Sequence, residues 1–487
     1  MTPENILERL RAARTPEERA LVNVAIVLDG QSDTLRRGVQ AAAVPHWFDG
    51  QILAALLEIS PTSAEPLYGG LTALSFVEPF HAREAHNVHD LTRRALLKQL
   101  IGEDQALYLA LSQRAARCFE NRDHPTEKIE AIYHDLLSAS DEAIDRLWAL
   151  YAEWAGQEAA GWLQSLAAAL DEHLEANRLT DNPRAMALYL TALIGLDYRP
   201  LAQTASRLEK ALEYYRATKD EFYQGGVLGS LGEIRALQGK AKDARACYEE
   251  QLDLRRRLAQ ANPTELSHRQ NLFTGYLRLG DFEVDQKNPE AAMNFYQAAQ
   301  VIARELAEKD PQNVRCQTAL AYSHERMGRA QINADRAGEA LRSYETALDI
   351  TKVVVDKDPQ NPTRQRELLV SFFHLGDVLF KLNLYDRALE YYRAALPIAE
   401  ERAATNARNT SNQRDLTATH NNIGDVLRAQ GRYQEALDCY TTAHGIRETL
   451  VALDPENAQW QEDIAETRKN IDKARELLKS SAAGGEA

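Results

Sequence analysis

Five ionisable residues recur at one fixed interval in the C-terminal half of the chain, and this spacing points to a binding function. The residues are Glu233, Asp281, Arg329, Asp377 and Asp425, each 48 positions after the last, and four of the five are acidic. Carboxylates repeated along one face would form a negative track suited to a basic or neutral segment of a partner. The alternative is that they are ordinary solvated residues of helices, and the sequence leaves both interpretations open.

Motifs that carry catalytic or cofactor chemistry are missing from the sequence. The chain contains no GxSxG, HExxH or DxDxDG motif and no GxxxxGKS/T loop for nucleotide phosphates. Its 12 histidines are dispersed, and its four cysteines show neither CxxC nor metal-ligand spacing. We therefore expect a protein that is not an enzyme and that requires no cofactor or metal.

A ladder of small and aromatic residues shares the 48-residue period of the ionisable row and must position that row. Glycines at 232, 280, 328, 376 and 424 are each followed twelve residues later by an alanine and sixteen residues later by a tyrosine. Glycine in a helix interior costs about 1 kcal/mol relative to alanine. Five glycines in phase therefore predict that two antiparallel helices approach each other closely in every repeat.

The Leu-Gly, Ala and Tyr spacing of the ladder resembles the tetratricopeptide repeat over roughly half of the chain. That repeat is usually about 34 residues long, so a period of 48 residues predicts that both helices are lengthened by about two turns. The resemblance implies a mainly α fold, a right-handed α-solenoid whose first helices line the concave face. The ionisable row would lie on that face.

Three further residues join the candidate groove. Phe373 and Asn421 lie three positions ahead of a ladder glycine, and Asn422 follows. The two asparagines resemble those that clamp a peptide backbone in long-repeat relatives, although one repeat alone carries them. In co-chaperone repeats, Lys and Asn at two groove positions bind an acidic chaperone tail. Here the first of these positions has no Lys and the second has no Asn, so binding of an acidic chaperone tail is not expected.

The segment 1–122 predicts a different fold. We expect helices at 17–28, 34–44, 50–59 and 61–74, strands at 74–79 and 85–88, and a helix over 89–100. This order makes a winged-helix domain. The runs FVEP at 76–79 and VHDLTR at 88–93 resemble the winged-helix domain of STAND signalling ATPases, in which the motif histidine, here His89, contacts nucleotide.

The remaining boundaries follow from helical periodicity and from the ladder. Residues 123–222 predict a helical connector that caps the first repeat, and the run EAIYHDLL at 130–137 resembles the segment after the winged helix in STAND proteins. The five repeats span 223–455. A charged capping helix is expected at 456–480, and a disordered tail at 481–487.

Charge and composition limit the partners. The net charge of −15 disfavours nucleic acid and anionic membranes. The helix at 61–74, placed to read DNA in a winged helix, contains no Lys or Arg. The chain lacks an apolar leader and any apolar run of about 18 residues, and its cysteines suggest no redox pairing. These features favour the cytoplasm.

Together the features predict a non-catalytic scaffold or regulator that binds a partner protein through the solenoid. STAND relatives without their ATPase imply a bacterial signalling or defence system, with an effector such as a caspase-like peptidase as partner. Two alternatives stay open. The chain is a substrate or inhibitor of such a protease, cleaved in the loop at 406–412, or it is a winged-helix transcription regulator.

Overall fold

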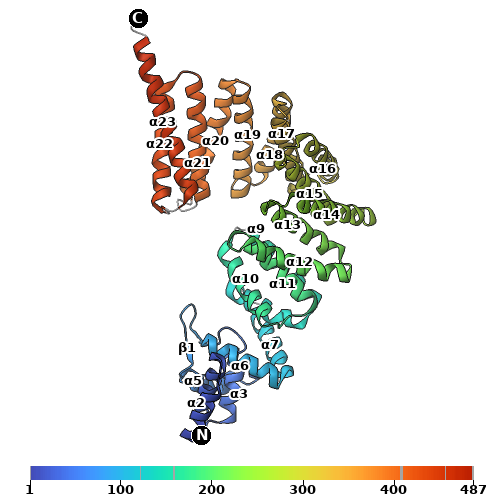
Figure 1. The fold of residues 1–487 in the computed structure, drawn as a ribbon, viewed down its shortest axis with the longest axis vertical. Coiled ribbons are helices and arrows are strands. Elements are labelled where there is room, and N and C mark those ends of the chain that lie inside the picture. The colour runs from blue at the N-terminus through green and yellow to red at the C-terminus, as the bar shows by residue number, and fades with distance from the viewer. Residues whose placement is uncertain are drawn as a thin grey trace. The chain divides into compact units, whose positions relative to one another are not determined.

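The computed structural model describes residues 2–120, 122–156, 159–405, 410–453, 455 and 457–484. The chain divides into two compact units, Met1–Lys240 and Ala241–Ala487. Both are mainly helical, as the sequence predicts, and one two-stranded sheet lies in the first unit (Figure 1). Most of the loop expected to be open to a protease falls at 406–409, outside the described residues.

The first unit begins with a small region of helices and a hairpin, here called the helix–hairpin region. Its helices are α1 (Pro3–Ala12), α2 (Pro16–Val27), α3 (Asp33–Ala42), α4 (Gly50–Leu57), α5 (Pro61–Thr72), α6 (Asp90–Glu103) and α7 (Gln105–Phe119). Strands β1 (Val77–Phe80) and β2 (Ala85–Val88) pair antiparallel. Phe48 adds a bridge to His86, and the core gathers around Trp47, Phe48 and Leu97.

The connector forms the rest of the first unit. Its helices are α8 (Pro125–Asp135), α9 (Asp141–Gly156), α10 (Ala160–Glu175), α11 (Asp181–Ile194), α12 (Leu201–Thr218) and α13 (Glu221–Leu237). The helices α7 and α8 pack directly together, so the helix–hairpin region and the connector share one unit.

The second unit is a stack of helix pairs. It begins with α14 (Ala241–Ala261), continues through the pairs α15 (Leu266–Asp285) and α16 (Pro289–Lys309), α17 (Val314–Asn333) and α18 (Ala337–Lys357), α19 (Pro362–Lys381) and α20 (Tyr385–Thr405), α21 (Thr410–Ala429) and α22 (Tyr433–Leu453), and ends with α23 (Ala458–Gly484). The paired helices are 20 and 21 residues long, which confirms the lengthened repeat.

The ladder residues explain how each pair packs. A Cβ built on Gly328 would lie 2.8 Å from the ring of Tyr344, and one on Gly424 would lie 2.7 Å from the ring of Tyr440. No alanine fits such a gap without displacement, so glycine is required for this approach. The Tyr344 ring also stacks on His374 of the following repeat, with ring centroids 4.9 Å apart.

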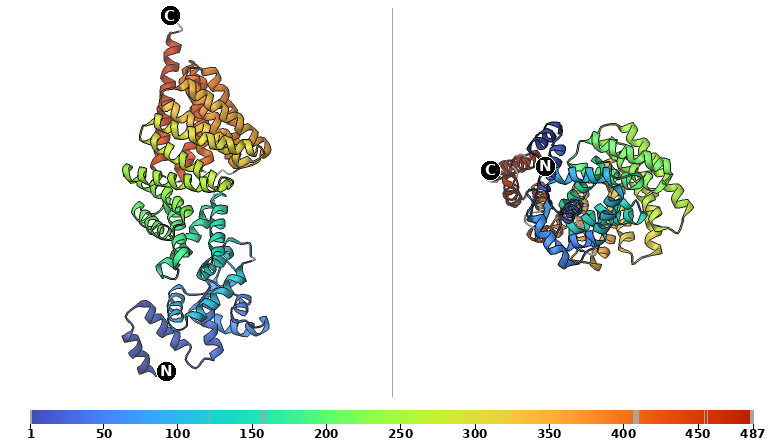
Figure 2. Two further views of the ribbon diagram at one scale, coloured as in Figure 1. Left: turned by 90° about the vertical axis from the view of Figure 1, so that its right-hand side faces the viewer. Right: turned by 90° about the horizontal axis from the view of Figure 1, so that it is seen from below.

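The last helix of the second unit is α23. α23 packs against α22, and its C-terminal turns project beyond the neighbouring helices (Figure 2). α23 continues to Gly484, whereas the sequence predicts disorder from residue 481 onwards. Residues 485–487 lie outside the described residues. Among the helices that the structure describes, none is long and apolar enough to cross a membrane.

Candidate functional site

Seven of the eight predicted partner-binding residues lie on the first helices of the second unit. They are Asp281 on α15, Arg329 on α17, Phe373 and Asp377 on α19, and Asn421, Asn422 and Asp425 on α21. Their positions relative to the ladder glycines fall within an arc of about 100° on a helix. We call the surface of α15, α17, α19 and α21 that carries these seven residues the first-helix face. Glu233 lies on α13 in the other unit, where it is exposed.

The aspartates of this face bind tyrosines of their own repeats. The hydroxyl of Tyr296 donates to Oδ1 of Asp281 at 2.6 Å, and that of Tyr440 donates to Oδ1 of Asp425 at 2.7 Å. Tyr392 donates to Asp377 in the same way. Aspartate and tyrosine are 15 residues apart each time, a signal that was available in the sequence. The carboxylates therefore hold the two helices of a repeat together.

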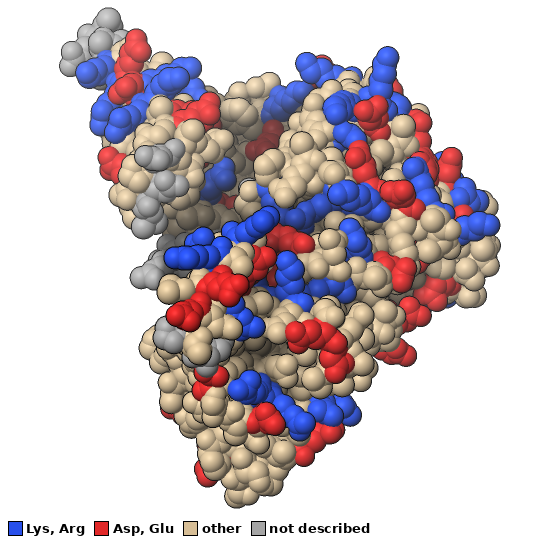
Figure 3. Space-filling model, turned by 60° about the horizontal axis from the view of Figure 1, so that its bottom comes forward, with Lys and Arg blue, Asp and Glu red and all other residues tan. Residues whose placement is uncertain are grey.

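Arginines neutralise part of the predicted negative track. Arg326 and Arg329 each place a guanidinium nitrogen 3.3 Å from Oδ1 of Asp281. Arg428 lies 2.9 Å from Oδ1 of Asp425. On the face drawn in Figure 3, basic and acidic side chains are interspersed rather than segregated. Ion pairing thus leaves fewer free carboxylates than the fixed spacing suggests.

The other predicted residues are partly used by the fold. Asn421 is 9 % exposed, and its amide oxygen, in the orientation that satisfies its neighbours, accepts from Arg447 at 3.2 Å. Asn422 is half-buried. Phe373 packs against the core between the last repeats and keeps part of its ring accessible. Asn421 therefore has less freedom to bind a peptide backbone than Asn422.

Two polar residues of this face were not selected from the sequence. Glu325 on α17 accepts a hydrogen bond from Ser371 on α19 at 2.7 Å, and burial raises its pKa to about 7. His374 lies beneath Tyr344, and burial lowers its pKa to about 4. At neutral pH the histidine is uncharged and the carboxyl group is partly protonated. Ionisable side chains therefore cluster where α17 meets α19.

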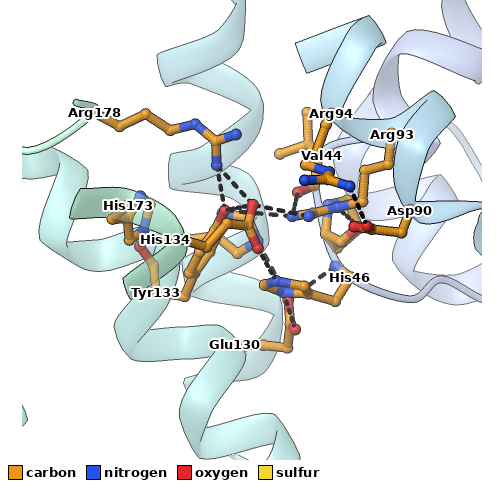
Figure 4. A network of polar contacts seen from close by, with 12 residues as sticks. Val44, His46, Asp90, Arg93, Arg94, Glu130, Tyr133, His134, His173 and Arg178 are labelled. Atoms are coloured by element: carbon orange, nitrogen blue, oxygen red, sulfur yellow. Dashed lines mark hydrogen bonds and ion pairs between the residues drawn. The ribbon is translucent and has the colours of Figure 1, made fainter. Parts of the chain in front are cut away.

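A buried charge network forms a second cluster, within the first unit (Figure 4). His46, in the loop before α4, places Nδ1 2.6 Å from Oε1 of Glu130 on α8 and Nε2 2.8 Å from Oε2 of Glu172 on α10. Carboxylates only accept hydrogen bonds, so both ring nitrogens must carry protons. His46 is therefore an imidazolium that joins the helix–hairpin region to the connector.

Glu172 is the hub of this network. Its Oε1 accepts from Arg93 at 2.9 Å, from Arg178 at 2.9 Å and from the hydroxyl of Tyr133 at 2.7 Å. Arg93 also donates to the carbonyl of Pro45 at 3.2 Å, which fixes the loop that carries His46. The network thus links α6, α8 and α10 through charges that would be costly if unpaired.

The electrostatics of the network agree with its geometry. Burial and Arg93 oppose a charge on His46, but the carboxylates of Glu130 and Glu172 hold its pKa above the usual value. Despite burial, the same contacts hold the pKa of both carboxylates well below theirs. Burial lowers the pKa of His173 to about 3, so that imidazole is neutral.

The resemblance to STAND proteins singles out a different histidine. His89 precedes α6, is exposed and makes no capping hydrogen bond with its side chain. It contributes no contact to the network around Glu172 that the structure describes. Together with Arg93, His46 joins the two parts of this unit, and its partners are 84 and 126 positions away in the sequence.

The fold and the ladder geometry define a mainly helical protein built on stacked tetratricopeptide-type helix pairs. Family models of the tetratricopeptide repeat match residues 370–402 and 415–486. No curated protein sequence matches the chain.

Several solved structures are similar. BtubC from P. vanneervenii is 18% identical, with 52% of this chain and 92% of that chain covered and a TM-score of 0.43. A STAND protein with a tetratricopeptide repeat sensor from Pyrococcus horikoshii is 13% identical, with 99% and 71% covered and a TM-score of 0.46. A Rap protein complexed with Competence and Sporulation Factor is 15% identical, with 78% and 97% covered and a TM-score of 0.40.

Proposed function

We propose that this chain is a non-catalytic scaffold or regulator that holds a partner protein on its first-helix face. Tetratricopeptide repeats typically bind proteins, and four consecutive first helices here offer side chains at a constant interval. The setting we propose is a bacterial signalling or defence system, with an effector such as a caspase-like peptidase as the partner. The helix–hairpin region, as a winged-helix module, makes a second protein contact.

Unsatisfied polar atoms on α17 and α19 carry this proposal. Nε of Arg326, Nε of Arg329 and Nδ1 of His374 are shielded from water and have no hydrogen-bond partner among the described residues. An unpaired buried polar group costs about 1–3 kcal/mol. The two arginine side chains as a whole remain 22% and 40% exposed, so a docked partner that places acceptors beside their terminal guanidinium nitrogens stabilises this cluster and favours a bound face.

The helix–hairpin region supports a protein contact better than a DNA contact. α5 precedes the hairpin and carries Glu65 but no Lys or Arg. Reading base edges requires such donors in the groove. A transcription regulator therefore remains the weaker candidate, and tight binding of duplex DNA at physiological salt would favour it.

Capture of the partner from the native host tests the proposal. The full chain is used as bait together with Tyr322→Ser, which removes a side chain on α17 that is 39% exposed, and Val353→Ser as a matched control on α18, where the side chain is 54% exposed. We expect a stoichiometric protein, identified by mass spectrometry, with wild type and Val353→Ser but not with Tyr322→Ser. Equal recovery with all three baits, or none, would contradict the proposal.

A further inference from the structure

The helix pair α17–α18 departs from its neighbours at one position. In the pairs α15–α16, α19–α20 and α21–α22, the ladder tyrosine donates its hydroxyl to an aspartate one residue after the ladder glycine. In α17–α18, Arg329 occupies the place of that aspartate. Tyr344 stacks on His374 there, and its hydroxyl has no carboxylate acceptor among the described residues.

The two arginines beside this position are only partly satisfied. Arg326 and Arg329 approach the same Oδ1 of Asp281, each at 3.3 Å, and Tyr296 donates to that atom as well. Charge-assisted bonds from nitrogen to a carboxylate are normally about 2.7–2.9 Å long. One carboxylate thus serves two guanidinium groups at long range, and Arg326 donates in addition to the hydroxyl of Tyr322 one turn earlier. The Nε atoms of both arginines lack partners in the described part of the chain.

Neighbouring acidic residues do not replace the missing aspartate. Glu325 lies one turn before Arg329, but its carboxyl group accepts from Ser371 on the next helix. Asp377 accepts from Tyr392 of its own repeat. The side chains of Arg326 and Arg329 remain 22% and 40% exposed. An incoming ligand can therefore reach both guanidinium groups.

We infer that this position, bordered by Arg326, Arg329 and Tyr344, receives a carboxylate from an acidic segment of the partner protein. The carboxylate takes the place that aspartate holds in the other three pairs, and it accepts from the two guanidinium groups and the tyrosine hydroxyl. This inference rests on the proposed function and specifies its partner. It reverses the preference for a basic segment that the spacing of acidic residues suggests.

A labelled acidic peptide tests the inference. Fluorescein-labelled hexaglutamate is titrated with the full chain at about 150 mM salt and followed by anisotropy, with labelled hexaglutamine as the neutral control. Arg329→Asp restores the tyrosine–aspartate pattern of the other pairs and removes the cation. Arg342→Asp makes the same change of charge at an exposed position on α18. Circular dichroism verifies that both variants fold, and Arg329→Gln replaces the first if it does not.

The expected result is saturable binding of hexaglutamate by wild type and by Arg342→Asp, weakened at least about tenfold in Arg329→Asp, since paired charged contacts are removed. Hexaglutamate that fails to bind wild type, or that binds both aspartate variants alike, overturns the inference. If Tyr322→Ser loses the native partner but wild type does not bind hexaglutamate, the scaffold function is supported and the inference of an acidic segment is refuted. If no captured protein depends on the first-helix face, the proposed scaffold function itself is refuted.

Discussion

Replacement of His46 by glutamine should destabilise the first unit by about 2–4 kcal/mol. The imidazolium makes two charge-assisted hydrogen bonds, each contributing about 1.5–3 kcal/mol. Glu172 retains Arg93 and Arg178, so its share of the loss is small. Glu130 is only 5% exposed and keeps a contact of 3.5 Å with His134, so most of the loss falls on this carboxylate.

The same contacts give the first unit a characteristic pH dependence. The pKa of His46 is raised above 6.5 in the folded chain by Glu130 and Glu172. Its stabilisation is therefore complete below pH 6.5 and is lost as the pH rises through the folded value. The ring is 31% exposed, so solvent can take up its proton. Burial lowers the pKa of His134 and His173, which are already neutral in this range.

Tryptophan fluorescence during urea unfolding measures this effect. Four of the five tryptophans lie in the first unit, and a Trp460→Phe background removes the signal from the second. We expect wild-type stability to fall as the pH rises above 6.5 and His46→Gln to show a lower, flat profile. His89→Gln is the control and should match wild type. Identical profiles for the two glutamine variants would refute the role of His46.

Three further predictions concern the second unit. Gly424→Ala should destabilise this unit by about 1–3 kcal/mol, because the new Cβ would lie 2.7 Å from the ring of Tyr440. Gly445→Ala is the control: a Cβ there meets nothing within 4 Å, so this change should stabilise α22 by up to about 1 kcal/mol. Urea unfolding monitored by circular dichroism compares the two variants. Glu325 has its pKa raised from 4.5 to about 7, so the folded chain binds the extra proton and stability falls as pH rises across that interval. Glu325→Gln should abolish this slope and stabilise the unit at about pH 8 by about 1–2 kcal/mol, and an unchanged slope would refute that assignment. Arg414→Gln, which breaks a 3.9 Å surface pair, should change the free energy of unfolding by less than about 1 kcal/mol.

The repeats were predictable because their signal is local and periodic. The ladder glycines identified where two helices approach, and the 48-residue period gave the length of both helices. The strand at 85–88 and the helix beginning near His89 also match the structure. Helices α1 and α7 were not predicted, since neither contains a ladder residue or a motif that marks a helix.

The clusters of charge were less predictable because they depend on contacts distant in sequence. His46 meets Glu130 and Glu172 across 84 and 126 positions, and no spacing in a single sequence reveals such a pairing. The row of acidic residues was visible in the sequence. Its hydrogen bonds to tyrosines of the same repeats were not predicted, because they depend on how two helices face each other. Arg329 stands where the other pairs have an aspartate that accepts a hydrogen bond from a tyrosine such as Tyr296 or Tyr440, and the structure is needed to recognise this difference.

Hydrogen–deuterium exchange on the purified complex with the captured partner tests the central claim most directly. If the first-helix face holds the partner, complex formation should slow exchange in α15, α17 and α19 and leave α16, α18 and α20 largely unchanged. The effect should be greatest around Tyr322 and Phe373, whose side chains are accessible in the chain by itself. Protection confined to the second helices or to the helix–hairpin region would contradict the account.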